Sequence, residues 1–383
     1  MAGIFVTNYK LPPSPFQFFI APMYATGSKD ITGLGSVAYT FFPSGMFRKI
    51  RLHVNAWRFN VDDFQSAEQP KLSLMATKIS PDIKLTLKNK DARSNLNRFF
   101  KIKSYFFNEE FLSFYRDTVV IGLDTTITSK YRARSEERSL HQASFVIENN
   151  RVLYPYRGEL KLETGKDFAK IGFTGNYFFN YPKEGGLDVR LFAGKFFYTS
   201  AKTISKQFAT DRYHLNLTGP NGYEDYTYSD YFIGRNEFEG LASQQVMMRD
   251  GAFKVRTDLL AAKVGRTDDW LAAVNFNTTI PSGMNPLSML PVKIPLRIYA
   301  DIGTHAEAWD EEAEEDRFLF NAGLQLSLLF ETVHIYLPLV YSNVYKEYIQ
   351  STLPKKGRLW QTVSFSIDFS GFHPRKIDRR FTF

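Results

Sequence analysis

The run Phe318-Leu319-Phe320-Asn321-Ala322-Gly323-Leu324-Gln325-Leu326-Ser327-Leu328 decides the fold class of this chain. Apolar residues stand at every second position of the run, and the residues between them from Asn321 to Ser327 are polar or small. Successive side chains of a β-strand point to opposite faces of a sheet. This spacing therefore predicts a strand with one apolar face and one polar face.

The same alternation recurs along most of the chain, with no helical periodicity beside it. The clearest further segments are Phe16–Ala25, Ile31–Phe42, Arg48–Val61, Tyr154–Thr164, Phe168–Tyr181, Tyr213–Thr218, Trp270–Ile280, Ile294–Gly303, Val333–Tyr341 and Leu359–Phe369. Runs of about 9–12 residues have the length that a tilted strand needs to cross a bilayer, whereas strands of soluble sandwiches average about 5–6. We predict an all-β fold, a closed antiparallel transmembrane β-barrel of about 16 strands, because only a closed sheet leaves no unpaired edge in lipid. An all-β soluble adhesin is the alternative fold.

The composition carries no signal for a transmembrane helix or for a nucleic-acid partner. No apolar run approaches the roughly 18 residues that a membrane-spanning helix needs. The net charge is +8, but the basic residues are interleaved with acids along the strand-like segments. That arrangement favours a solvated or lumen-lining set of charges over a nucleic-acid surface.

No constellation of catalytic or metal-binding residues is apparent. The chain has no Cys, which excludes a disulfide, a thiolate nucleophile and a Cys-based metal site. The six His residues are far apart, and neither a zinc motif nor a nucleophile elbow occurs. We therefore predict that the chain is not an enzyme and binds no cofactor or metal.

The chain divides into a barrel over residues 1–369 and a basic tail over residues 370–383. The N-terminus has no signal-peptide features, so we expect an exported barrel to be preceded by further sequence. The segment His305–Asp316 carries an acidic run, which predicts a solvated loop, with a cation-binding or partner-binding role as the alternative. The charged stretch Tyr131–Arg138 also predicts a loop.

The segment Gly219–Asp269, called the long loop below, precedes the last five expected strands. It contains Arg235, whereas Asp301 and Arg297 share the polar face of the strand Ile294–Gly303. If that face lines a lumen, the long loop could fold inward and bring Arg235 against Asp301. We name Arg235, Asp301 and Arg297 as a candidate structural latch.

From about Asp211 to Phe369 the order of these features resembles the Omp85 superfamily, which includes outer-membrane insertases and translocators. Ile233-Gly234-Arg235-Asn236 stands where those barrels carry an Arg-Gly-aromatic motif, although Asn236 replaces the glycine. Tyr299-Ala300-Asp301-Ile302-Gly303 resembles their aromatic-x-Asp-x-Gly strand end. The resemblance implies 16 strands, a loop folded into the lumen, and pairing of the loop arginine with Asp301. The final strand, with Phe365, Ile367 and Phe369, is the candidate assembly signal.

Three segments also resemble the barrel that follows M1-type metallopeptidase modules in Bacteroidota surface proteins. They are Phe18–Tyr24, Gly186–Lys195 and Phe232–Arg235. This resemblance implies an upstream peptidase domain, in which any peptidase activity would reside. The peptidase's His-Glu-x-x-His motif does not occur in this chain.

These observations predict a barrel in the bacterial outer membrane that anchors, inserts or translocates protein and is plugged by an inward loop. The expected partners are the lipid bilayer, the barrel assembly machinery, and either a linked upstream peptidase domain or a translocated protein. A diffusion porin, and the barrel of a membrane-bound M1-type aminopeptidase, are the alternatives.

Overall fold

The computed structural model describes residues 2–65, 70–91, 93–121, 124–181, 185–200, 213–257, 264–281, 283–289, 295–313, 315–329 and 331–369. Within them lie a 16-stranded sheet and a separate two-stranded sheet of β12 and β13. The expected number of strands is thus confirmed. The order of the large sheet follows the chain from β1 to β18, and these two strands stand at its ends. Closure into a barrel stays a prediction.

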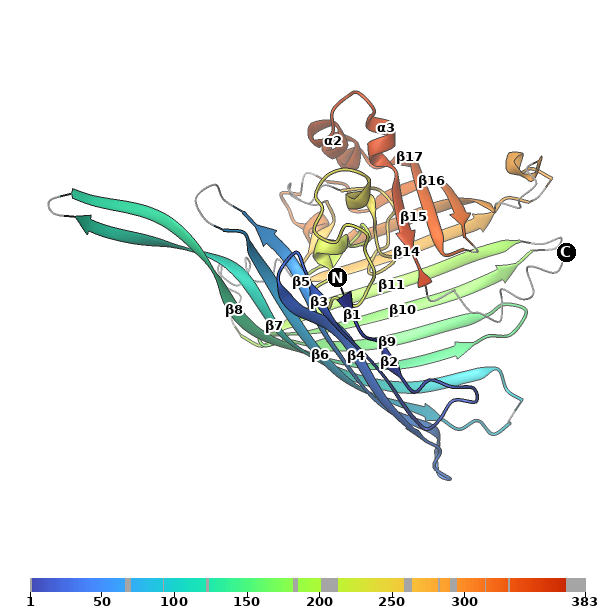
Figure 1. Cartoon of the computed structure of the whole chain (residues 1–383). Coiled ribbons are helices and arrows are strands. Elements are labelled where there is room, and N and C mark those ends of the chain that lie inside the picture. The colour runs from blue at the N-terminus through green and yellow to red at the C-terminus, as the bar shows by residue number, and fades with distance from the viewer. Residues whose placement is uncertain are drawn as a thin grey trace. The chain divides into compact units, whose positions relative to one another are not determined.

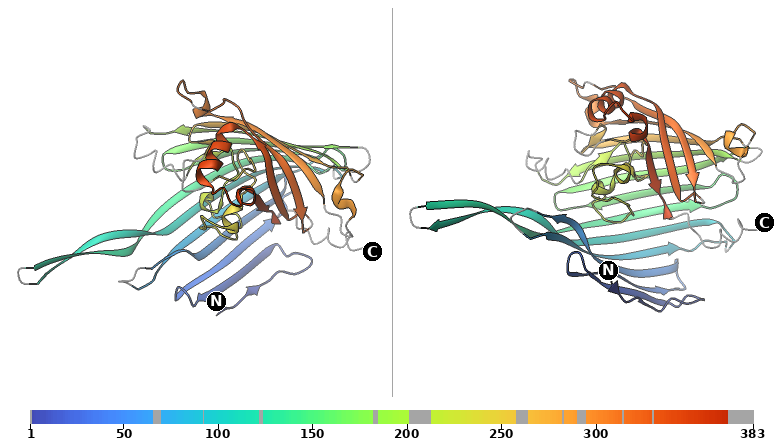
Figure 2. Two further views of the ribbon diagram at one scale, coloured as in Figure 1. Left: turned by 90° about the horizontal axis from the view of Figure 1, so that it is seen from above. Right: turned by 45° about the horizontal axis from the view of Figure 1, so that its top comes forward.

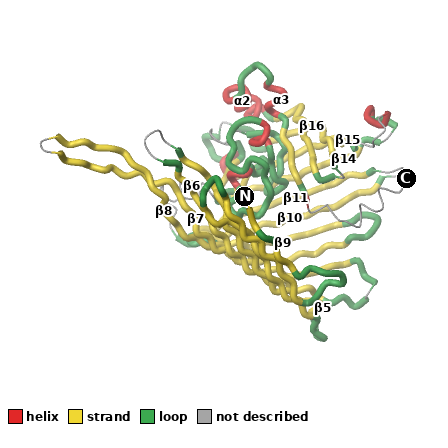
Figure 3. Tube along the Cα trace, in the orientation of Figure 1, coloured by secondary structure: helices red, strands yellow, loops and turns green. Residues whose placement is uncertain are grey.

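The strands have the following bounds: β1 Ala2–Gly3, β2 Val6–Thr7, β3 Phe16–Ala25, β4 Asp30–Phe41, β5 Phe47–Phe64, β6 Leu72–Leu87, β7 Leu96–Ile121, β8 Asp124–Asn149, β9 Tyr156–Thr164, β10 Phe168–Asn180, β11 Gly186–Tyr198, β12 Leu215–Asn216, β13 Arg266–Thr267, β14 Trp270–Thr279, β15 Leu296–His305, β16 Leu319–Leu328, β17 Val333–Tyr341 and β18 Ser364–Ile367. Two α-helices, α2 over Asn343–Thr352 and α3 over Arg358–Thr362, lie between β17 and β18. Four short 3-10 helices complete the described elements: η2 Gly222–Glu224, η3 Leu241–Gln244, η4 Pro286–Met289 and η5 Ala306–Trp309 (Figures 1 and 3).

The chain forms two units, of which the first comprises Met1–Val146 and Leu162–Asp167. β1 and β2 both pair with β3, and β3 to β7 pair antiparallel with their sequence neighbours, as β5 and β6 do from Phe47↔Leu87 to Phe64↔Leu72. The β7–β8 hairpin reaches past the ends of β5 and β6 (Figures 1 and 2). The expectation of a charged loop at Tyr131–Arg138 was wrong, because this stretch lies inside β8. Charged side chains are tolerated there because most of them are exposed.

The second unit comprises Ile147–Lys161 and Phe168–Phe383. Its strands β10, β11 and β14–β18 form a continuous antiparallel order. Large apolar side chains on one face are exposed, with Leu191 at 48%, Ile302 at 44% and Phe320 at 43%. Polar side chains on the other face are buried, with Asp301 and Asn321 both at 0%. The sheet therefore buries its polar side and exposes its apolar side, the reverse of a soluble domain.

The long loop lies against this polar face (Figure 2). The expected strand Tyr213–Thr218 is shorter in the structure, where only β12 remains and pairs with β13 at the base of the loop.

The expected strand Leu359–Phe369 is partly wrong, since α3 includes its first residues and β18 begins at Ser364. A helix of one turn is too short to leave a periodic signal in the sequence. No helix among the described residues is long and apolar enough to span a membrane.

Candidate functional site

A row of polar side chains crosses the polar face of the second unit. Arg190 of β11 stands opposite Asn275 of β14, Asn275 opposite Asp301 of β15, and Asp301 opposite Asn321 of β16. Residues directly opposite on antiparallel strands have Cβ atoms only about 5 Å apart. The period of two in each strand thus places four hydrogen-bonding side chains in one line.

The long loop docks on this row through Lys254. The Lys254 ammonium lies 2.6 Å from Asp301 Oδ1, and the two side chains are 6% and 0% exposed. Asn275 donates from Nδ2 to Asp301 Oδ1 at 2.9 Å and to the Gly251 carbonyl at 2.8 Å. Burial lowers the pKa of Lys254, whereas the Asp301 carboxylate favours its charged form. The contact between loop and strand thus pairs two buried charges of opposite sign.

Close backbone approach adds to this contact. A Cβ on Gly251 would lie 2.6 Å from the Leu217 Cα, and one on Gly303 would lie 2.5 Å from Leu217 Cδ2. Leu217 is itself fully buried. A side chain at Gly251 would meet the Leu217 backbone, whereas one at Gly303 would displace the Leu217 side chain that packs against β15.

The structure does not bring Arg235 to Asp301. Arg235 Nη1 lies 3.0 Å from Asp225 Oδ2, within the long loop itself. Arg297 is on the polar face as expected, but its guanidinium pairs with Asp188 and Glu331, each at 3.0 Å. The stretch before Arg235 folds back on η2. The Arg235 guanidinium therefore donates to the Gly222 carbonyl and to Asp225, and it does not reach the sheet.

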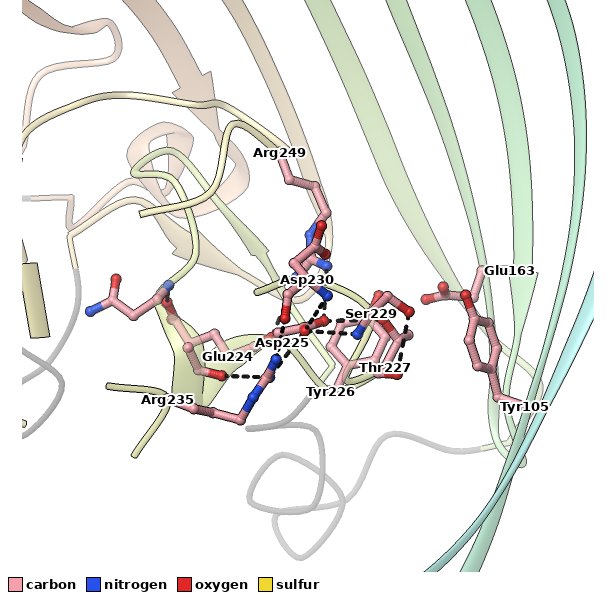
Figure 4. A network of polar contacts seen from close by, with 12 residues as sticks. Tyr105, Glu163, Glu224, Asp225, Tyr226, Thr227, Ser229, Asp230, Arg235 and Arg249 are labelled. Atoms are coloured by element: carbon pink, nitrogen blue, oxygen red, sulfur yellow. Dashed lines mark hydrogen bonds and ion pairs between the residues drawn. The ribbon is translucent and has the colours of Figure 1, made fainter. Parts of the chain in front are cut away.

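Asp225 is the centre of a second polar cluster, shown in Figure 4. Its carboxylate, which is fully buried, accepts hydrogen bonds from the backbone N–H groups of Ser229 and Asp230 and faces both Arg235 and Arg249. Burial alone would raise the pKa of Asp225, but the Arg249 and Arg235 guanidinium groups outweigh it and hold that pKa below its usual value. Burial and the Asp225 charge raise the pKa of Asp230. The Asp225 carboxylate thus links Ser229, Asp230, Arg235 and Arg249 of the long loop.

This cluster predicts that acid loosens the long loop. Because the pKa of Asp225 is lower in the fold than in the unfolded chain, its contribution is fully present above the unfolded pKa of about 3.9. The contribution is lost as pH falls through the folded value, although protonation of Asp230 works in the opposite direction. Pepsin digestion at stepped pH should cut the loop faster below about pH 4. Relative to an unstructured peptide cut by pepsin at the same pH, Asp225→Asn should lose this acid-dependent increase in loop cleavage; a wild-type ratio that stays flat would contradict the prediction.

The candidate assembly residues lie at the end of the described chain. Phe365 and Ile367 are in β18, and Phe369 follows it with its ring 5.4 Å from the Tyr231 ring. The basic tail over residues 370–383 lies outside the described residues.

In the acidic segment His305–Asp316, His305 Nε2 lies 2.8 Å from Glu315 Oε1, so this contact links the segment to the end of β15. The described residues contain no cluster of side chains that could hold a metal ion.

Lys254 is the residue that the sequence analysis missed. It stands between Phe253 and Val255, which are both fully buried. A lysine between apolar residues is a weak signal, because Lys263 of the same loop also stands between apolar residues, Ala262 and Val264. The pairing of Lys254 with Asp301 depends on how the loop folds.

Neither a family model nor a curated protein matches the chain. Among solved structures, CdiB from Acinetobacter baumannii is similar with a TM-score of 0.41 and 9% identity, over 86% of this chain and 51% of that one. BamA from Haemophilus ducreyi lacking POTRA domains 1-3 is similar with a TM-score of 0.41 and 10% identity, over 88% of this chain and 65% of that one. The chain thus spans about half to two thirds of the length of these structures.

Proposed function

We propose that the chain is an Omp85-like β-barrel of the bacterial outer membrane, which anchors, inserts or translocates protein and is plugged by the long loop. The observation that carries the proposal is the exposed apolar face of the second unit, with Leu191, Ile302 and Phe320 on it. Leaving one such side chain in water forgoes about 1.5–3 kcal/mol relative to burying it. A row of them across adjacent strands is stable only against an apolar surrounding, and lipid provides it.

A charge on this face tests the proposal. In Ile302→Arg, the arginine would face the hydrocarbon region, where a cationic side chain costs about 2–4 kcal/mol in a barrel. We expect a clear loss of membrane-inserted chain, measured by flotation with lipid vesicles and by heat-modifiable migration. Leu241→Arg is the matched control, because Leu241 is exposed on the long loop rather than on a strand. Equal insertion of both variants would exclude a lipid-facing role for Ile302.

The plug role is supported by the contact of the long loop with the polar face. Lys254 and Arg190 both take part, since Arg190 Nη1 donates to the Asp250 carbonyl at 2.7 Å. A loop held in this way would block diffusion through the lumen of a closed barrel. Large, steady conductance of the wild-type chain in planar bilayers would favour the alternative of a diffusion porin.

The upstream M1-type peptidase module, the barrel assembly machinery as partner and the origin in Bacteroidota also belong to the proposal. They depend on the resemblance of sequence segments alone. The gene sequence directly upstream of Met1 tests the first of them. A signal peptide followed by a His-Glu-x-x-His domain would support a peptidase anchor, whereas small tandem αβ repeats would support an insertase or translocator.

A further inference from the structure

A chain of hydrogen bonds joins a serine, a histidine and a carboxylate in the first unit. Ser36 lies in β4, His53 in β5 and Asp82 in β6, three strands that neighbour one another in the sheet (Figure 1). Ser36 Oγ lies 2.9 Å from His53 Nε2, and His53 Nδ1 lies 2.7 Å from Asp82 Oδ2. The positions are 17 and 29 residues apart, so no local motif of the sequence reveals them. The order of contacts is that of a nucleophile, a general base and an orienting carboxylate.

The register of the strands brings the three side chains together. His53 stands directly opposite Asp82 on β6 and directly opposite Ala38 on β4. Ala38 has only a methyl side chain, which leaves the imidazole room to lean toward Ser36, two residues earlier on the same face. Val37, which stands between them, belongs to the opposite, apolar face and is 42% exposed. The contacts therefore lie on the polar face of the sheet.

The chemistry of the partners determines which atom supplies each hydrogen. An ionised carboxylate can only accept, so in the neutral imidazole His53 Nδ1 donates to Asp82. His53 Nε2 then carries the lone pair and accepts the hydrogen of the Ser36 hydroxyl. A serine hydroxyl is activated as a nucleophile when an adjacent base can take its proton. Ser80, on the same face of β6, gives a contrast, because its buried hydroxyl has no hydrogen-bond partner among the described residues.

Cations surround these residues on the polar face. Two successive rows of opposite residues on β5, β6 and β7 carry them: Arg51, Lys84 and Lys101 in one row, and His53, Asp82 and Lys103 in the other. A concentration of positive charge attracts ligands of negative charge and favours the oxyanion that forms during acyl transfer. Ser36 is 4% exposed and the His53 side chain 14%, which restricts access to small molecules. The substrate that fits is a small ester with an anionic group.

We propose that Ser36, His53 and Asp82 form a catalytic triad that hydrolyses small carboxylic esters carrying an anionic group. Ser36 Oγ attacks the ester carbonyl carbon while its proton passes to His53 Nε2. The bond from that carbon to the alcohol oxygen breaks, and the alcohol leaves with the proton from Nε2. Water then attacks the acyl-Ser36 ester with the same proton transfers, which releases the carboxylic acid and restores the serine. Asp82 is a positioning residue, because it orients the imidazole and contacts no reacting atom.

The triad is separate from the contacts of the long loop. All three of its residues lie in the first unit, whereas Lys254, Asp301 and the Asp225 cluster lie in the second. The inference thus goes beyond the proposed function, and neither depends on the other. It replaces the expectation from sequence that the chain is not an enzyme.

The first test is covalent labelling of the wild-type chain in lipid nanodiscs with diisopropyl fluorophosphate. This probe phosphorylates a serine hydroxyl that an adjacent base activates, with loss of fluoride. We expect peptide mass spectrometry to find the adduct on Ser36 and not on Ser80. S36A should remove it, and H53Q should slow its formation by about a hundredfold or more, the usual effect of a general base. An unlabelled Ser36 in the wild type overturns the inference without reference to any variant.

Ester hydrolysis gives the second readout. The probes are 4-acetoxybenzoate and its neutral methyl ester, which present the same acetyl group. We expect kcat/KM to be about tenfold higher for the anion, a preference that added salt should reduce. D82N should lower kcat and leave KM unchanged, because it disturbs the imidazole and not the binding of substrate.

Two controls make the result specific. S80A should hydrolyse both esters at the wild-type rate, and each variant is first shown to float with lipid vesicles, so that lost activity is not lost folding. Hydrolysis by S36A at the wild-type rate would overturn the triad and leave the proposed function untouched. Equal kcat/KM for the two esters would overturn the assignment of an anionic substrate.

Discussion

Replacing Lys254 with alanine should loosen the long loop on the sheet, although Asn275 and Arg190 still bind its Gly251 and Asp250 carbonyls, and cost about 3–5 kcal/mol of stability. The substitution leaves the Asp301 carboxylate at 0% exposure without its ammonium partner; Asn275 and Asn321 still donate hydrogen bonds to it, and the Arg190 guanidinium acts on it electrostatically. Removing one partner of a buried pair is costly because the remaining charge has no compensation. In planar bilayers, we expect K254A to show conductance that the wild type lacks, together with faster tryptic cleavage of the loop.

Two comparisons isolate the ion pair. K254M/D301N removes both charges of the pair and should recover part of the lost stability, since neither member is then left as an unpaired buried charge. Arg235→Ala is the second comparison, because the sequence pattern favoured Arg235 as the partner of Asp301. R235A should leave the conductance closed, as its guanidinium contacts Asp225 and not the sheet. Opening by R235A but not by K254A would contradict the observed pairing.

Replacing Asp225 with alanine should disorder the long loop internally while leaving it attached to the sheet. The substitution leaves Arg235 and Arg249 facing each other without the carboxylate between them, and deprives two backbone N–H groups of their acceptor. We expect a loss of about 3–5 kcal/mol for the local fold of the loop. Hydrogen exchange should rise sharply in residues 225–235, whereas the strands should stay protected.

D225A also has a matched comparison. Asp230→Asn alters a neighbouring carboxylate whose pKa is raised by burial, so removing its charge should cost little or even stabilise the loop. Protection of the loop in D225A equal to that in D230N would show that the Asp225 cluster does not organise it. Because Lys254 remains in place, D225A should conduct far less than K254A.

The alternation of apolar and polar residues was sufficient to predict most strands. The expected bounds of β3 and β17 coincide with those found, and β10 and β14 differ by one residue. A strand that spans the membrane faces lipid on one side and a polar interior on the other, which imposes a period of two on its sequence. The alternation can therefore be recognised without knowing which strands are its neighbours. The charged stretch Tyr131–Arg138 of β8 lacks this alternation, and the sequence therefore predicted a loop there instead of a strand.

The site was predicted less completely than the fold. Asp301 and Arg297 were placed correctly on the polar face, because their positions follow from strand periodicity alone. The partner of Asp301 depends on the path of an irregular loop. Glycine contacts, the turn at η2 and the Asp225 cluster determine that path together, and none of them has a periodic signature. Sequence therefore identified the acceptor strand but not Lys254.

The length of β7 and β8 has a consequence for topology mapping. Each strand has 26 residues, or about 86 Å at about 3.3 Å per residue, against a hydrocarbon core of about 30 Å. In the proposed membrane setting, the end of β7 at Ile121 and the start of β8 at Asp124 lie well outside the bilayer on one side. An epitope inserted there, probed with antibody on intact cells, would establish which compartment it faces. Since successive strands run in opposite directions, that single result would orient every strand of the chain.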